Sequence, residues 1–167
     1  MSRRHANVVN LDEVPAVGGP KVGSFASELK PLAREAGARA LGCTHHEVSP
    51  GQAAFPFHWH SANEEAAYVL EGTGLLRIGA EEVAVRAGDW ISFPVGPDHS
   101  HQLRNTGTGP LRYLCVSTKQ TPEICGYPDS KKYGIAAMGG DKLWVRALFF
   151  EEDGKGYFER EPDAEPK

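Results

Sequence analysis

The sequence predicts an all-β protein, built as an antiparallel sandwich or barrel. Apolar residues in the middle of the chain recur with a period of two, which is the period of side chains on one face of a strand. The apolar segments are short, and glycine, proline, asparagine or aspartate lies at most of the junctions between them. Eight such segments follow one another, as a double-stranded β-helix requires.

The expected elements follow in order along the chain. Residues 26–38 are compatible with a short helix or an irregular arm, interrupted by Pro31. The eight expected strands cover residues 38–49, 54–60, 65–71, 74–79, 81–87, 90–94, 99–105 and 111–118. Residues 121–134 are expected to form a loop, and 141–152 one more strand. The tail, 154–167, is charged and contains proline, so its last several residues are expected to be disordered.

Length and composition indicate one compact domain in the cytoplasm. A chain of 167 residues can bury a core but is too short for two ordinary domains. A net charge of -4 gives no sign of a nucleic-acid or membrane surface. No apolar stretch that could be a signal peptide or a membrane span follows the basic residues 2–5. Cys43, Cys115 and Cys125 are odd in number and lack C-x-x-C spacing, so no disulfide framework is expected.

Two segments concentrate side chains that bind metal ions. His58 and His60 are separated by one residue, so both project from the same face of a strand. Glu65 follows a short polar stretch that can turn the chain, and folding back would bring its carboxylate beside the pair. His99 and His101 again share one face of an expected strand. Three imidazoles and one carboxylate suit one divalent transition metal ion, either iron, manganese, nickel, zinc or copper.

A single H-x-H pair is weak support for a metal site, because most such pairs are solvated or hydrogen-bonded. Here six of the seven histidines lie between residues 45 and 101, and Glu65 lies at a workable offset. We therefore interpret the cluster as a metal site. A purely structural ion is the alternative, and it would have a closed, usually tetrahedral shell of ligands.

The same residues resemble the first of the two sequence motifs of the cupin superfamily. That motif consists of a glycine, an H-x-H pair, a glutamate and a second glycine in a fixed order. In this chain the order is filled by Gly51, His58, His60, Glu65 and Gly72.

The second cupin motif is also present, with one ambiguity. Its fixed positions are filled by Gly88, Pro94, Gly96 and Asn105. Its histidine is either His99, at the usual distance after P-x-G, or His101, at the usual distance before the asparagine. We favour His101, because the length of a loop before a strand varies more easily than a position within the strand. His99 remains the alternative ligand.

The resemblance covers roughly residues 40 to 118 and implies a cupin barrel, which is a double-stranded β-helix of the jelly-roll group. The motif pair occurs once, so one barrel is expected. The chain then divides into an N-terminal arm (1–38), the barrel (39–118) and a C-terminal extension (119–167) with the further strand and the tail.

A cupin with this centre is expected to act on a small molecule as a metal-dependent enzyme. Three chemistries suit it: a dioxygenase that cleaves a diol, diketone or aminophenol, a decarboxylase of a small acid, and a sugar isomerase. The alternative is a non-catalytic protein that binds a sugar or another small metabolite. The side chains that could assist are Tyr68, Tyr113, Arg77, Arg104 and Arg112, although packing or surface roles explain them equally well.

The resemblance also implies a homodimer. If His58, His60 and Glu65 face the barrel interior, alternation places Phe57 and Trp59 on the outer surface. Exposed aromatic side chains need cover, which a second subunit or a terminal segment can provide. Cupins commonly pair through such faces, so we expect a homodimer, and a monomer covered by its own arm is the alternative.

Overall fold

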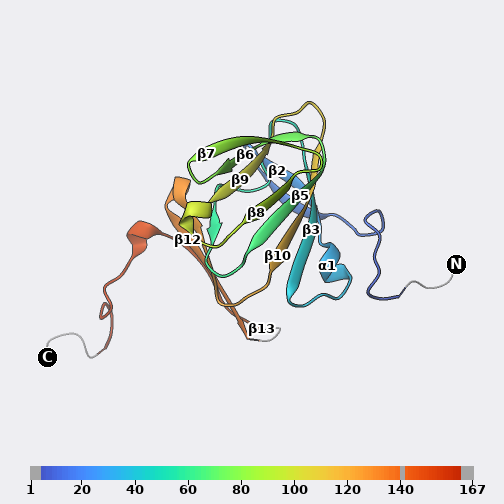
Figure 1. Cartoon of the computed structure of the whole chain (residues 1–167). Helices are drawn as coiled ribbons and strands as arrows, with labels where there is room; N and C mark the ends of the chain where they lie inside the picture. Colours follow the sequence, from blue (N-terminus) through green and yellow to red (C-terminus); the bar gives the residue numbers. More distant parts are fainter. Residues whose placement is uncertain (1–4, 140–141, 163–167) are drawn as a thin grey trace.

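The computed structural model describes residues 5–139 and 142–162. Within these residues the chain forms thirteen strands and one short helix, arranged as a barrel of two facing layers (Figure 1). All strand pairs are antiparallel, so the all-β prediction is confirmed. One layer is a six-stranded sheet formed, in spatial order, by β1 (Val17–Val22), β2 (Phe25–Lys30), β3 (Leu41–Val48), β10 (Leu111–Thr118), β5 (Glu65–Glu71) and β8 (Trp90–Phe93).

The facing layer consists of two smaller sheets. The first contains β7 (Glu81–Arg86), β6 (Thr73–Ile78) and β9 (His101–Asn105), and the second contains β13 (Lys142–Phe150), β12 (Lys132–Gly139), β11 (Glu123–Tyr127) and β4 (Trp59–His60). The backbones of His58 and His101 join these sheets, because each residue's N–H donates to the other's carbonyl, at 3.1 and 2.8 Å. The segment around β4 therefore lies beside β9, although the two are forty residues apart in sequence.

The hydrophobic core lies between the layers. It is formed by Val48, Ala54, Ala67, Val69, Leu76, Val85, Ile91, Phe93, Leu103, Leu111 and Tyr113. Alternation along each strand sends these side chains inward, and burial of a large aliphatic or aromatic side chain stabilises the fold by about 1.5–3 kcal/mol. The turn between β5 and β6 passes through Gly72 at φ +87°, where a Cβ would collide with the carbonyl of Pro110.

The N-terminal arm contributes to the larger sheet. Residues 26–38 were expected to form either a short helix or an irregular arm. They form most of β2 and then α1 (Leu32–Glu35), which begins after Pro31. β2 pairs with β3, so the arm extends the barrel sheet.

Several of the expected strands are shorter than predicted, including those at 38–49, 54–60 and 99–105. Of residues 54–60 only Trp59 and His60 belong to a strand, and Pro56 removes one backbone donor from the segment before them. The strand expected at 99–105 begins at His101, so the prediction that His99 and His101 share a strand face is wrong. His99 ends a 3₁₀ turn, η1 (Pro97–His99), which follows Gly96 at φ +109°.

The C-terminal extension contains three strands, where only one was expected. The predicted strand at 141–152 is confirmed as β13, but the loop predicted at 121–134 is wrong, since β11, the turn η2 (Pro128–Ser130) and the start of β12 lie there. Gly126 lies within β11 opposite Trp59, and only glycine fits there, because a Cβ would collide with the indole of Trp59. The chain ends, within the described part, in the turn η3 (Glu151–Asp153) and exposed residues to 162; the disorder predicted for the last residues falls on 163–167, outside the described residues.

The chain itself covers the two outward aromatic side chains. Phe57 is 5% exposed and lies under the guanidinium of Arg77, 3.7 Å from the ring centroid. Trp59 packs edge-to-face against Tyr133 of β12, with ring centroids 6.5 Å apart. Residues 57 and 59 therefore give no reason of their own for a dimer. Among the described residues, no helix is long and apolar enough to cross a membrane.

Candidate metal centre

The barrel brings together four of the side chains that the sequence singled out. One potential ligand atom each from His58, His60, Glu65 and His101 lies within 4.8 Å of all the others. The three imidazoles come from one layer of the barrel, and Glu65 comes from β5 in the facing sheet. One carboxylate oxygen of Glu65 lies 3.3 Å from Nε2 of His60 and 3.5 Å from Nε2 of His101. This cluster could hold a metal ion.

Backbone carbonyls orient two of the imidazoles. Nδ1 of His58 lies 2.8 Å from the carbonyl oxygen of Pro56, and Nδ1 of His101 lies 3.0 Å from that of His99. A carbonyl only accepts, so each Nδ1 carries the hydrogen and each Nε2 keeps its lone pair. This is the tautomer that a ligand nitrogen at Nε2 requires.

The third imidazole leaves a buried nitrogen unsatisfied. Nε2 of His60 is inaccessible and makes no hydrogen bond with any described group, because its contact with Glu65 lacks hydrogen-bond geometry. Buried polar atoms are nearly always paired, so this nitrogen calls for a partner. A metal ion at the cluster would supply one, and the donor set therefore fits a metal.

The structure separates the two candidate histidines of the second motif. The side chain of His101 lies in the cluster, whereas His99 contributes only its backbone carbonyl to the ring of His101. The assignment of His101 as the metal ligand stays a prediction.

Burial and mutual contact set the charges of the metal-free cluster. Burial and the neighbouring His101 and His60 lower the pKa of His58 to about 4. Burial alone would lower the pKa of His60, but contacts with Cys125 and Glu65 raise it to about 10. Burial alone would raise the pKa of Glu65, but its close contacts with the imidazoles of His101 and His60 hold it well below its usual range. Glu65 is therefore an anionic carboxylate at neutral pH.

A cavity of about 310 Å³ opens onto the cluster. Its apolar wall is formed by Leu29, Ala54, Phe55, Ala67, Phe93 and Leu103. Besides the four clustered residues, its other lining residues are Thr44, His46, Gln102, Tyr113, Cys115 and Ser117. No lysine or arginine of the described chain lines it.

Comparison with known proteins places this barrel in a family. The sequence profile of the family described as "Cupin domain" matches residues 44–117. Residues 44–117 form a cupin domain. A 60-residue stretch is also 42% identical to the uncharacterized protein MJ1618 of Methanocaldococcus jannaschii, a match over 36% of this chain and 46% of that protein. The match thus spans about half the length of that relative.

Solved structures share the cupin fold over most of the chain. A putative sugar phosphate isomerase from Acidithiobacillus ferrooxidans superposes with a TM-score of 0.76 at 21% identity, over 90% of this chain and 96% of that one. A sugar phosphate isomerase of the cupin superfamily from Silicibacter pomeroyi gives 0.75 at 22% identity, over 87% and 93%. The polyketide cyclase RemF from Streptomyces resistomycificus gives 0.56 at 27% identity, over 74% and 83%. The first two matches show that the likeness in fold extends beyond the cupin domain itself.

Sequence reasoning did not assign a role to His46 in the cupin cavity. Its side chain is 5% exposed, its burial lowers its pKa to about 4, and its Nδ1 has no hydrogen-bond partner among the described residues. The sequence did contain a signal for this position, because alternation along β3 places Thr44 and His46 on one face. Both residues line the cavity.

The three arginines that could assist a reaction interact with groups outside the cavity lining. Arg77 pairs with Asp129 at 2.7 Å, and Arg104 donates to the carbonyl of Gly51 at 3.4 Å. Arg112 pairs with two carboxylates, those of Glu47 and Glu71, at 2.7 and 2.5 Å. Of the two tyrosines considered, Tyr113 lines the cavity and Tyr68 is 40% exposed.

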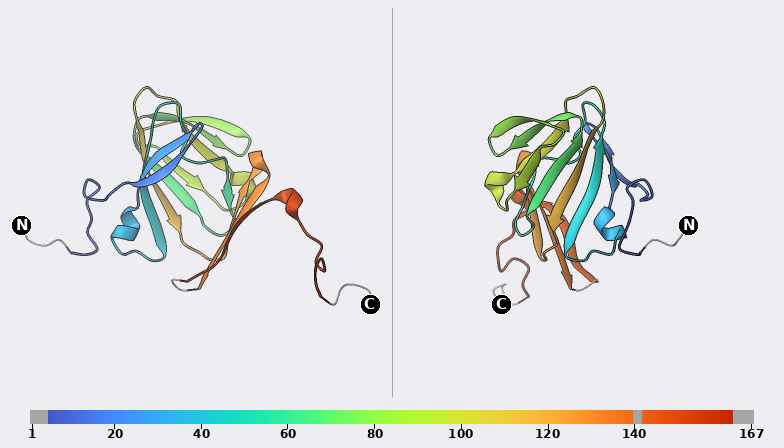
Figure 2. Two further views of the ribbon diagram at one scale, coloured as in Figure 1. Left: turned by 180° about the vertical axis from the view of Figure 1, so that it is seen from behind. Right: turned by 45° about the vertical axis from the view of Figure 1, so that its right-hand side comes forward.

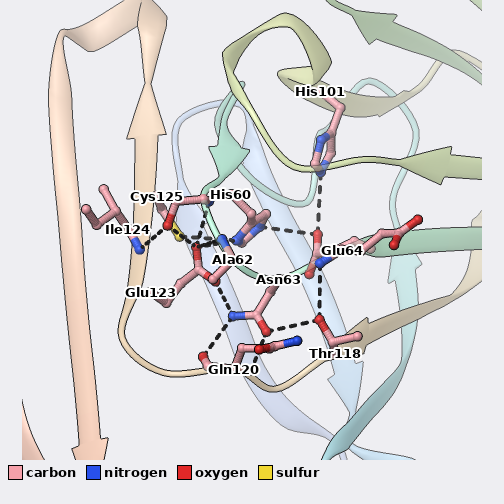
Figure 3. A network of polar contacts seen from close by, with 12 residues as sticks. His60, Ala62, Asn63, Glu64, His101, Thr118, Gln120, Glu123, Ile124 and Cys125 are labelled. Carbon is pink, nitrogen blue, oxygen red and sulfur yellow. Dashed lines mark hydrogen bonds and ion pairs between the residues drawn. The ribbon is translucent and has the colours of Figure 1, made fainter.

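Two residues beside His60 lie in the segment for which a loop was predicted. Cys125 and Glu123 of β11 face the side of His60 that is turned away from Glu65 (Figure 3). Their alternation in E-x-C was a signal for a shared strand face, but the prolines and glycine around them suggested a turn.

Proposed function

We propose that the cupin domain binds one divalent transition metal ion through His58, His60, Glu65 and His101, and that the protein is an enzyme. We further propose that it acts on a small, uncharged molecule with two neighbouring oxygen functions, and that oxidative cleavage of the dioxygenase type is its reaction. The observation that carries this proposal is the cavity at the cluster, which is largely apolar and has no lysine or arginine among the described residues that line it.

The lining argues against phosphorylated sugars and small diacids as substrates. A buried phosphate or second carboxylate needs charged or hydrogen-bonding partners to offset the loss of water. The described lining offers no cation for the phosphate of a sugar phosphate or for the free end of a small diacid. The two structural neighbours named as sugar phosphate isomerases therefore support the fold of this chain, and not that substrate.

The same lining favours a substrate with an apolar body. Phe55 and Phe93 form part of the wall, and an aromatic or aliphatic skeleton can pack against them. Three neutral imidazoles and the carboxylate of Glu65 leave a divalent ion with one net positive charge. This balance suits a chelating molecule that loses one proton, such as a β-diketone or a phenol.

The metal and the residues of the chain have separate tasks. A bound ion supplies Lewis-acid chemistry, and iron adds the redox chemistry that dioxygen requires. His46, kept uncharged by burial, lines the cavity and can exchange a hydrogen bond or a proton with the bound molecule. The apolar wall excludes water from the reacting molecule. Cleavage of a carbon–carbon bond by a dioxygenase places both oxygen atoms in the products, so the reaction needs no further reductant.

The first test is metal content, followed by turnover. Tag-free protein is analysed by elemental mass spectrometry beside a His58→Ala, Glu65→Ala double variant, before and after anaerobic reconstitution with iron(II). Oxygen uptake is then measured with acetylacetone, catechol and 2-aminophenol, and substrate loss with glucose 6-phosphate and oxalate. We expect near-stoichiometric metal in the natural protein only, and oxygen uptake only with the uncharged chelating molecules.

Other outcomes would contradict specific parts of the proposal. Turnover of glucose 6-phosphate or oxalate would overturn the substrate class. A thermal shift with one of the uncharged molecules and no product would overturn the enzyme assignment in favour of a non-catalytic small-molecule binder. Zinc in a preparation from cells does not identify the working metal, because zinc and copper bind such sites more tightly than iron or manganese.

A further inference from the structure

His60 differs from the other two clustered histidines in how its ring is held. The rings of His58 and His101 are oriented by backbone carbonyls. Nδ1 of His60 lies instead 3.3 Å from the sulfur of Cys125 and 3.7 Å from a carboxylate oxygen of Glu123 (Figure 3). Both side chains come from β11, beyond the residues that match the cupin profile.

The register of β11 explains this placement. Cys125 lies opposite His60 and Gly126 opposite Trp59 in the pairing of β11 with β4. Residues two apart in a strand share a face, so Glu123 and Cys125 both face His60. The C-terminal strand is thereby built into the wall of the centre.

Glu123 also holds the connector between two of the clustered residues. Its Oε1 accepts hydrogen bonds from the backbone N–H of Ser61 at 2.9 Å, the hydroxyl of Ser61 at 3.3 Å and the backbone N–H of Ala62 at 3.4 Å. Its Oε2 accepts a further bond from the side-chain amide of Asn63 (Figure 3). These residues lead from His60 to Glu65, so one buried carboxylate fixes the path between the two.

A second metal ion is a poor occupant for this position. His60, Glu123 and Cys125 do offer three ligand atoms within 4.8 Å of one another. However, Oε1 of Glu123 already accepts three hydrogen bonds, and Nδ1 of His60 must carry the hydrogen when Nε2 binds the main site. The sulfur of Cys125 and the carboxylate of Glu123 are instead placed as hydrogen-bond acceptors around the Nδ1–H group of His60.

We propose that Cys125 and Glu123 are positioning residues of the metal centre, an inference that rests on the proposed metal site. The Nδ1–H group of His60 donates to the sulfur of Cys125, and the adjacent Glu123 carboxylate favours that hydrogen. The contact fixes the tautomer and the orientation of the ring and makes Nε2 a stronger ligand. Loss of such an outer contact typically weakens metal binding by about 10- to 100-fold.

Cobalt(II) binding tests this role without any substrate. The dissociation constant is measured by competition with a coloured chelator, and the visible spectrum of bound cobalt reports the ligand geometry. The variants are Cys125→Ala, Cys125→Ser and Glu123→Gln, with Cys43→Ala as the matched control, since Cys43 is half-buried on β3 and does not line the cavity. We expect about 10- to 100-fold weaker binding and an altered spectrum for Cys125→Ala and Glu123→Gln. Cys125→Ser keeps an acceptor and should recover part of the affinity, and Cys43→Ala should equal the natural protein.

The outcomes separate this inference from the proposed function. Absence of cobalt binding by the natural protein would overturn the metal site and this inference together. Tight binding by the natural protein and by all three variants, within about twofold, would overturn only the positioning role. An equal loss in Cys43→Ala, or a loss that follows the melting temperature of the metal-free variants, would show a general effect on the fold and also overturn it. If Cys125→Ala does not fold, Cys125→Ser and Glu123→Gln decide the outcome.

Discussion

His46 and Tyr113 lie directly opposite each other on β3 and β10, and their rings stack with centroids 4.7 Å apart and planes 19° apart. Both side chains are 5% exposed and line the cavity. Burial lowers the pKa of His46 to about 4 and raises the pKa of Tyr113 well above its usual range. The pair is therefore uncharged over the whole physiological range of pH.

The uncharged state of His46 should make the metal-free fold sensitive to acid. Between pH 6.5 and about 4 the unfolded chain binds a proton at His46 and the folded chain does not, so the free energy of unfolding falls as the pH falls. One proton over this window corresponds to roughly 3 kcal/mol. Urea unfolding of metal-free protein at several pH values should show this loss, and His46→Phe should have a flatter profile.

The control for this prediction is His5→Gln, which replaces an exposed histidine far from the cavity. It should follow the profile of the natural protein. A His46→Phe protein that loses stability in acid as steeply as the natural one would show that His46 is not the titrating group.

Among the polar residues of the barrel, we expect Asn105 to contribute most to the free energy of unfolding. It is fully buried, donates from Nδ2 to the carbonyls of Val48 at 2.7 Å and Gly109 at 2.9 Å, and accepts at 2.9 Å from the N–H of Gly107. Asn105→Ala leaves these backbone groups without partners, which should lower the free energy of unfolding by about 3 kcal/mol. Urea denaturation measures the change, with the exposed Gln120→Ala, which keeps the backbone groups that bond Asn63, as control, expected within about 0.5 kcal/mol of the natural protein. A loss below about 1 kcal/mol for Asn105→Ala would contradict this role.

The sequence was most informative where one local rule dominates. If Glu65 faces inward, alternation along its strand places Ala67 and Val69 on the inner face too, and in the structure they are 1% and 0% exposed. The H-x-H pair, Glu65 and His101 could be grouped because motif spacing and alternation agree about them. These side chains lie together in the structure, and their role as metal ligands stays a prediction.

The sequence was least informative where a contact across the fold decides the local structure. Gly126 belongs to a strand because Trp59 packs against it, and no local pattern shows that neighbour. The sequence around His46 does not distinguish it from other strand residues, because its stacking partner Tyr113 lies on a different strand, β10. The strand at 99–105 begins late because the 3₁₀ turn at Pro97–His99 takes up its first residue. In each case the signal depends on the partner segment and not on the segment itself.

We expect the protein to form a homodimer through β13. This strand lies at the edge of its sheet, and its hairpin with β12 extends past the barrel (Figures 1 and 2). Trp144, Leu148 and Phe150 on β13 are 66%, 62% and 50% exposed, so a second copy would cover a large apolar surface and an unpaired strand edge.

Light scattering coupled to size-exclusion chromatography tests this expectation. A Trp144→Glu, Leu148→Glu variant should raise the dissociation constant at least about a hundredfold, since each large apolar side chain contributes about 1.5–3 kcal/mol when buried. Tyr157→Glu, which alters an exposed aromatic residue outside β13, is the control and should remain dimeric. A natural protein that is monomeric at micromolar concentration would contradict the predicted homodimer.

His101→Ala and His99→Ala form a matched pair that tests the ligand assignment. His101 contributes a ring nitrogen to the cluster, whereas His99 contributes a backbone carbonyl that any residue at that position retains. We expect His101→Ala to weaken cobalt(II) binding at least about a hundredfold, more than the loss of an outer contact, and His99→Ala to leave it within about twofold. Elemental analysis of the purified proteins provides a second readout. Equal metal affinity in the two variants would overturn the preference for His101. The reverse order would show that the second cupin motif supplies its ligand from His99, and that the ring of His101 only packs against Phe93, where their centroids lie 3.8 Å apart.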